Sequence, residues 1–260
     1  MNTARLTASA ELGLALTIFV AANLLDLVPI SETPWNFVLG WVSLRLRRKG
    51  WSSLGLVRPP NWGRAIAISL AAAIGLQLLS EFVTEPLITL FTYRPTDLSS
   101  FRPLVGNLEL AIGYLALIWT LAAFGEELVY RGYILNRAVD LGSRTLRAWI
   151  ASYLSVSLLF GFGHPYQGPT GVADSTVSGL IYGGLYLAFG RNLWIPILTP
   201  DLRTWSYDIV IHFRSAAHRC AVKFGRKCVI VLRTGQNHVS RFFLTRIPSS
   251  CAFTPVQSIG

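Results

Sequence analysis

Two adjacent carboxylates and an arginine stand together near the middle of the chain, in the stretch Phe124-Gly125-Glu126-Glu127-Leu128-Val129-Tyr130-Arg131. On a helix, Glu127 and Arg131 are four positions apart and share a face, with the carboxylate on the N-terminal side, as a favourable ion pair prefers. Glu126 lies about 100° further round the helix, so Arg131 neutralises it less directly. The spacing therefore leaves one carboxylate suited to act as a general base.

A different interpretation of the same stretch is a helix end that emerges into the lipid headgroups. The two glutamates would then be solvated, and the Arg131 side chain would extend along the apolar surface towards water. The preceding residues 111–124 are apolar, and a charged group at membrane depth costs about 2.5–3.5 kcal/mol, so it usually marks a functional site or a buried pair. Spacing alone leaves both interpretations open.

His164 is the only histidine in residues 1–200, and it closes the apolar stretch 148–163. It lies four residues after Phe160, hence on the same helical face, while Gly161 and Gly163 allow a neighbouring helix to approach closely. A lone histidine at a helix end is more often hydrogen-bonded than catalytic, so His164 alone is weak evidence for a site. We expect a polar loop over residues 164–175 and a glycine-rich helix over 176–189.

The elements that must position these residues are hydrophobic helices. Of the 260 residues, 52% are apolar and 14% charged, and the mean hydropathy is +0.47, whereas a soluble domain has about 25% charged residues. A freely soluble protein is therefore excluded, and the composition predicts an all-α, polytopic membrane bundle of about six hydrophobic segments. The hydrophobic segments are 12–30, 34–44, 65–91, 103–130, 148–163 and 176–190. For the first of them, a signal peptide is the competing interpretation.

The basic residues of the body predict a multi-pass protein of the cell membrane with a cytoplasmic N-terminus. In that orientation the outer side receives only Arg94 and Arg102. The excess of positive charge on the inner side follows the positive-inside rule, by which cytoplasmic loops of membrane proteins are rich in Lys and Arg. The lipid bilayer is then a partner, and the charge does not indicate nucleic-acid binding. The inner side receives Arg5, Arg45, Arg47, Arg48, Lys49, Arg58, Arg64, Arg137, Arg144, Arg147 and Arg191.

The two motifs, Glu126-Glu127-Leu-Val-Tyr-Arg131 followed by Phe160-Gly-Phe-Gly-His164, resemble those of the CPBP family, the CAAX prenyl protease and bacteriocin-processing proteins also called ABI. The segment 190–198, which follows the glycine-rich helix, is similar to the run into the third motif of that family. The family-like core spans about residues 103–198. The resemblance implies an intramembrane endopeptidase that hydrolyses a peptide bond in a membrane-associated or prenylated peptide or protein.

The resemblance also implies roles for the motif residues. Glu126 would activate a water molecule, Glu127 and Arg131 would hold the site in shape, and Phe160 would support it. His164 would orient the water or stabilise the developing oxyanion. Family members have been described both as metal-dependent and as glutamate-type proteases. A divalent metal such as zinc would here bind Glu126 and His164, with Glu127 as the third ligand if it turns inward, and a catalytic zinc normally has three protein ligands.

The chain departs from the family after residue 198. The family has a histidine just after the Pro-Ile-Leu segment, whereas this chain reads Thr199-Pro200-Asp201. Residues 201–260 hold 9 Lys+Arg against 2 Asp+Glu, which is +7 of the total +10, and all three cysteines. We therefore divide the chain into a membrane-embedded domain, 1–199, and a basic tail, 200–260, that is frame-shifted, diverged, misjoined or disordered. His212 or His218 could replace the missing residue, but neither is followed by a hydrophobic helix.

Three functions remain open from the sequence. The first is an intramembrane protease. The second is a catalytically inactive relative that acts as a binding or immunity protein, for which the missing third motif is the best argument. The third is a proton-coupled transporter that uses Glu126, Glu127 and His164 as a relay.

Overall fold

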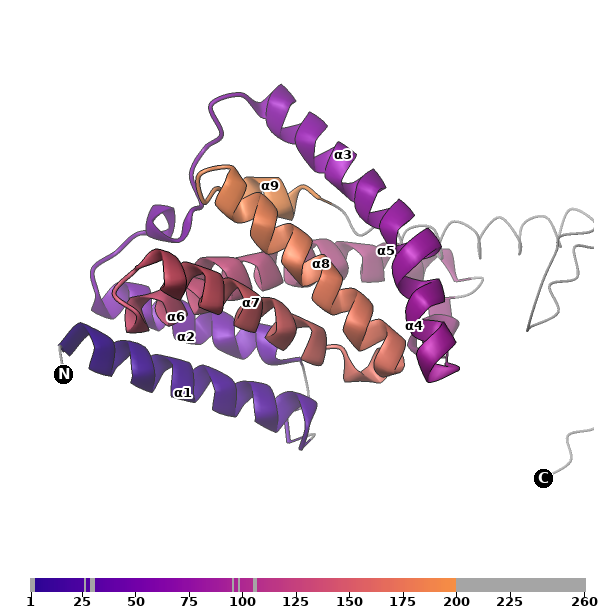
Figure 1. The fold of residues 1–260 in the computed structure, drawn as a ribbon, viewed down its shortest axis with the longest axis horizontal. Helices are drawn as coiled ribbons and strands as arrows, with labels where there is room; N and C mark the ends of the chain where they lie inside the picture. The colour runs from indigo at the N-terminus through magenta and orange to yellow at the C-terminus, as the bar shows by residue number, and fades with distance from the viewer. Residues whose placement is uncertain are drawn as a thin grey trace, which may run out of the picture.

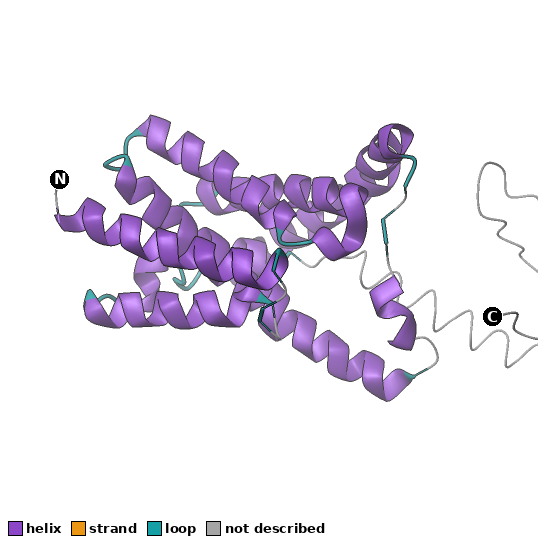
Figure 2. Ribbon diagram, turned by 90° about the horizontal axis from the view of Figure 1, so that it is seen from below, coloured by secondary structure: helices purple, strands orange, loops and turns teal. Residues whose placement is uncertain are grey.

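The computed structural model describes residues 3–199, apart from residues 26, 29, 30, 95, 98, 105 and 106. Throughout that part of the chain the regular elements are all helices, and no strand occurs (Figure 2). The predicted all-α class is thus confirmed there. The predictions made for the tail, including His212 and His218, lie outside the described residues.

The helices follow one another in a simple order, with α for regular α-helices and η for 3₁₀ or π segments. They are α1 (Thr3–Asn23), α2 (Glu32–Leu46), η1 (Trp51–Leu54), α3 (Trp62–Leu79), η2 (Ser80–Thr84), α4 (Glu85–Thr92), η3 (Ser99–Leu104), α5 (Leu108–Leu117), η4 (Ile118–Ile134), α6 (Leu135–Leu141), α7 (Leu146–Phe162), η5 (Pro165–Gln167), α8 (Gly168–Ala188) and α9 (Trp194–Ile197).

Three stretches of helix are long and apolar enough to cross a membrane: Arg5–Asn23, Trp62–Thr92 and Ile112–Leu141. A fourth results if α7 and the helix over Pro165–Ala188, which meet at a bend of 59°, count as one span. Large apolar side chains are exposed on the outer surface, as lipid contact requires; Phe82 and Phe91 are three-quarters exposed. The prediction of about six segments is not confirmed for the described residues.

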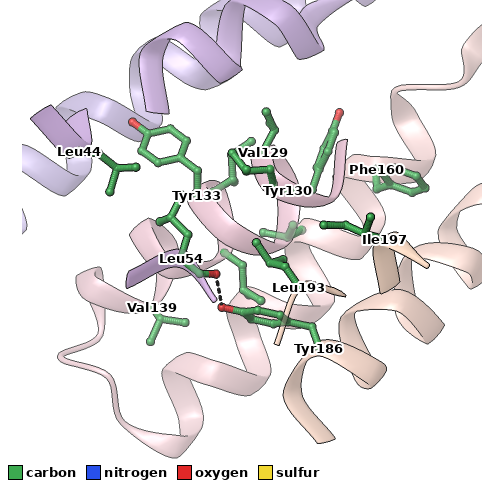
Figure 3. Packing of buried hydrophobic residues seen from close by; sticks show 14 residues of the cluster. Leu44, Leu54, Val129, Tyr130, Tyr133, Val139, Phe160, Tyr186, Leu193 and Ile197 are labelled. Atoms are coloured by element: carbon green, nitrogen blue, oxygen red, sulfur yellow. Dashed lines mark hydrogen bonds between the residues drawn. The ribbon is translucent and has the colours of Figure 1, made fainter. Parts of the chain in front are cut away.

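The centre of the bundle is the segment η4, which continues α5 and runs into α6 (Figure 1). It packs on α2, α6 and α7, while α1 lies beside α2 and α6, and α8 crosses α7 (Figure 1). The core gathers around η4 and α6 and includes Val129, Tyr130, Tyr133 and Val139 (Figure 3). η4 is π-helical over its whole length. π-Helical segments are rare in proteins, and those that occur are often found at functional sites.

Helices α7 and α8 approach each other through glycines. A Cβ built on Gly161 of α7 would lie 1.9 Å from Thr176 Oγ1 and 2.6 Å from the Val172 carbonyl of α8. A Cβ on Gly179 of α8 would lie 2.9 Å from the Ser157 carbonyl of α7. The close approach expected at Gly161 is thus confirmed.

The polar loop expected over 164–175 is wrong from Gly168 onward, because α8 begins there. The polar residues of its first turns have partners on the long helix α3–η2–α4. Ser80 Oγ donates to Asp174 Oδ1 at 2.8 Å, and the Thr170 and Thr92 hydroxyls are 3.1 Å apart. These side chains are polar because they join two helices.

The basic residues gather at one end of the bundle. Arg5 of α1 donates to Ser143 in the turn between α6 and α7. Arg144 and Arg191 both lie over the ring of Trp149, at 5.2 and 5.5 Å. At the other end of α8, the Arg94 carbonyl accepts a hydrogen bond from Thr170. These contacts separate Arg94 from the larger group, and the cytoplasmic placement of the N-terminus stays a prediction.

Candidate active site

Glu127 and Arg131 form a buried ion pair, with Arg131 Nη1 2.7 Å from Glu127 Oε1. The two residues are 3% and 2% exposed. The pair predicted from the four-residue spacing is therefore confirmed. The alternative of a solvated helix end is wrong for these two residues, because both lie inside the bundle.

The Arg131 guanidinium joins three helices. It donates to the Gly179 carbonyl of α8 at 3.2 Å, and it lies 4.3 Å from the ring centroid of Phe160 in α7 and 5.4 Å from that of Tyr182 in α8. A cation over an aromatic face is attracted by the negative face of the ring, more strongly where water is excluded. Arg131 thus fixes η4 against the helix pair that carries His164.

The second oxygen of Glu127 stands apart. Glu127 Oε2 is buried and has no hydrogen-bond partner within the described part of the chain. Buried carboxylate oxygens are nearly always hydrogen-bonded. Glu127 therefore keeps one acceptor oxygen without a partner in the interior of the described bundle.

Glu126, the other carboxylate of the motif, is half-buried. Tyr130 follows four residues later on the same helix, so the two side chains lie on neighbouring positions of one face. The preceding residue, Gly125, is packed against α2, since a Cβ there would lie 3.2 Å from Thr33 Cγ2. The ion pair of Glu127 and this packing together fix the backbone at Glu126.

His164 lies just beyond the end of α7, half-buried, and still on the face of Phe160. Its Nδ1 is 2.9 Å from the Phe160 carbonyl oxygen, and the two ring centroids are 5.0 Å apart. Because a carbonyl oxygen only accepts, this contact makes Nδ1 the protonated nitrogen. In the neutral ring, Nε2 then carries the lone pair.

Tyr130 lies on the same segment as Glu126, η4, and its side chain packs against the segment that carries His164. Its ring packs edge-on against Phe160, with centroids 5.1 Å apart. A Cβ built on Gly163, next to His164, would lie 3.2 Å from Tyr130 Oη. The two segments thus meet at one level of the bundle, and the catalytic roles of Glu126, Glu127, Arg131, Phe160 and His164 stay predictions.

Three residues near this site did not follow from the sequence: Asn23, Glu32 and Tyr130. The Tyr130 hydroxyl donates to Glu32 Oε1, and Asn23 Nδ2 donates to Glu32 Oε2 at 2.9 Å. Glu32 opens α2, where an acidic residue ordinarily needs no explanation beyond the helix dipole. No pattern in the sequence therefore distinguished Glu32 from an ordinary acidic residue at the start of a helix.

Within the described ranges, no three His, Cys, Asp or Glu side chains are placed to hold a metal ion together. A catalytic zinc normally has three protein ligands. The described donor set therefore does not fit such a metal, and the mechanism below has no metal step.

Comparison with known proteins agrees with these motifs. The family model described as type II CAAX prenyl endopeptidase, Rce1-like, matches residues 108–199. No curated protein and no solved structure gives a match. The matched stretch contains both motifs and ends where the basic tail begins. Together with the membrane-length helices it indicates a membrane protein. Over residues 108–199, the chain is similar to the Rce1-like type II CAAX prenyl endopeptidases, which is consistent with a member of the CPBP family.

Proposed function

We propose that this protein is an intramembrane endopeptidase in which the Glu126 carboxylate activates a water molecule. The observation that carries the proposal is the buried Glu127–Arg131 pair, whose guanidinium also binds Gly179 and lies over Phe160. This pair fixes the backbone of the adjacent Glu126 relative to α7. A carboxylate held this way is suited to general base catalysis.

In this mechanism Glu126 takes a proton from the water as its oxygen bonds to the scissile carbonyl carbon. The proton then passes to the leaving amine as the carbon–nitrogen bond breaks, which gives a carboxylate and an amine. His164 Nε2 accepts a hydrogen bond from the water and orients it. Alternatively, an imidazole already protonated by solvent before the water attacks donates from Nε2 to the oxyanion, where a fixed donor stabilises charge that develops only in the transition state.

The substrate class we propose is a membrane-associated peptide, and the family description makes a prenylated C-terminal peptide the first one to test. Hydrolysis is measured with the full chain in proteoliposomes and a fluorogenic prenylated peptide. Glu126→Gln keeps the shape of the side chain but removes the base, so turnover is expected to fall by about 10²–10⁴-fold. The matched control is Glu109→Gln, an exposed glutamate of α5 on the same continuous helix, which should cleave like wild type.

Full activity of Glu126→Gln would reject the mechanism. A wild-type chain that binds the peptide without cleaving it would favour the inactive relative, because Thr199 and Pro200 stand where the family has its histidine. Proton-driven uptake by the same proteoliposomes, lost in Glu126→Gln, would favour the transporter.

A further inference from the structure

We infer that Glu32 is a positioning residue of this active site, because its carboxylate holds the Tyr130 hydroxyl and Tyr130 holds the Phe160–His164 ring pair. The inference rests on the proposed function. It also adds the first two helices to the site, since Glu32 and Asn23 both lie outside the matched residues 108–199.

The surroundings of Glu32 are those of a carboxylate with a fixed position. It is 4% exposed, and its two oxygens accept hydrogen bonds from Tyr130 and Asn23. A buried carboxylate is strongly disfavoured unless such donors offset the lost hydration. Each oxygen has one donor from a different element, so the carboxylate cannot rotate without breaking a hydrogen bond.

The contacts beyond Tyr130 lead to His164. The Tyr130 ring meets the Phe160 ring edge-on, at 89°, and the Phe160 carbonyl fixes His164 Nδ1. The Tyr130 hydroxyl also lies close to the backbone of Gly163, the neighbour of His164, since a single carbon added to Gly163 would lie 3.2 Å from both Tyr130 Oη and Glu32 Oε1. We therefore expect the loss of the hydrogen bond between Glu32 and Tyr130 to change the surroundings of the imidazole.

A second tyrosine–glutamate pair on the same helix provides the matched control. The Tyr133 hydroxyl donates to Glu11 Oε2 of α1 at 3.0 Å. Figure 3 shows both tyrosine hydroxyls leaving the core cluster on the side of the first two helices, with only Tyr130 beside Phe160. The two pairs are both a tyrosine hydroxyl on a carboxylate, but the ring stack near His164 consists of Tyr130, Phe160 and His164 and does not include Tyr133.

The kinetic test compares Tyr130→Phe, Glu32→Gln, their double variant and Tyr133→Phe in the full chain, with the prenylated peptide as substrate. Tyr130→Phe and Glu32→Gln should each lower kcat about tenfold and leave KM nearly unchanged. The double variant should lose no more than the worse single variant, because both act on one hydrogen bond: Tyr130→Phe removes the donor, and Glu32→Gln replaces the carboxylate acceptor by a weaker, neutral amide oxygen. Tyr133→Phe should keep kcat within about twofold, as expected of a substitution distant from the site. If Tyr130→Phe does not fold, Glu32→Gln decides.

A spectroscopic test does not need activity. The side-chain ¹⁵N signals of His164, assigned with His164→Gln, should shift in Tyr130→Phe and Glu32→Gln and stay in place in Tyr133→Phe. Unmoved His164 signals, or wild-type kcat in a folded Tyr130→Phe or Glu32→Gln, would overturn the inference. A wild-type chain that cleaves nothing while these signals shift would instead reject the proposed function and leave the positioning contact standing.

Discussion

The helix formed by η4 and α6 carries two clusters of charged side chains, one around Arg131 and one around Arg137. Among the residues that the structure describes, Arg131 forms one ion pair, with Glu127, and both side chains are at most 4% exposed. Around Arg137 the pairs are connected: Asp140 accepts from Arg137 and from Arg144, and Glu11 lies 3.7 Å from Arg137 Nε. The Arg144 side chain is 41% exposed.

The two clusters differ in how well each tolerates the loss of one charged side chain. A dry pair without a substitute partner leaves an uncompensated buried charge when one member is removed. A network with one end in water retains other partners, and solvent screens what is lost. The charge balance at the candidate active site therefore depends on one ion pair, whereas several ion pairs share the charge at the basic end.

The largest expected effect is that of Arg131→Met. It leaves Glu127 buried without its cation, which should destabilise the protein by about 3–5 kcal/mol and remove most folded material. Arg144→Met, the matched change in the network, should cost about 1 kcal/mol or less. The measurement is the melting temperature and the yield of monodisperse protein in detergent. Equal losses in the two variants would remove the distinction between the clusters.

A second substitution tests how tightly the helices close around the site. Gly161→Ala places a methyl group 1.9 Å from Thr176 Oγ1 and should cost about 1–3 kcal/mol through overpacking. Gly184→Ala on α8 has its nearest neighbour at 3.6 Å, the Tyr153 hydroxyl, so it should be neutral or stabilising by up to about 1 kcal/mol, as alanine favours helix. A melting temperature lowered more by Gly184→Ala than by Gly161→Ala would contradict the packing described.

The smallest expected effect concerns salt. At about 1 M ionic strength the Debye length falls to about 3 Å, which screens exposed charges but not buried ones. The difference in melting temperature between wild type and Arg144→Met should then shrink towards zero. For Arg131→Met, the lowering of the melting temperature relative to wild type should persist in any folded fraction. If that lowering disappeared at high salt, solvent would reach the Glu127–Arg131 pair.

The parts of the site that the sequence predicts are contacts within one helix. A spacing of four residues was enough to predict that Glu127 contacts Arg131 and that Phe160 contacts His164, because helix geometry alone decides which residues share a face. The glycine at 161 likewise marks close approach of another helix.

The parts that the sequence does not predict depend on where separate helices meet. Glu32 and Tyr130 are 98 positions apart, and no local pattern brings them together. Thr170 and Asp174 were assigned to a loop because they are polar, but their partners lie on another helix. The predicted number of hydrophobic segments is not confirmed for the described residues for a similar reason, since a bent pair such as α7 and α8 counts as two hydrophobic segments in the sequence.

The π-helical geometry of η4 restricts where relatives of this chain can gain or lose a residue. Because each backbone bond there spans five residues rather than four, deleting one residue between Ile118 and Phe124 can be absorbed as a π turn becomes an α turn. A deletion between Glu127 and Arg131 would instead reduce their spacing from four residues to three and change the angle at which the guanidinium meets its carboxylate. Length variation among relatives should therefore be confined to the residues before Gly125.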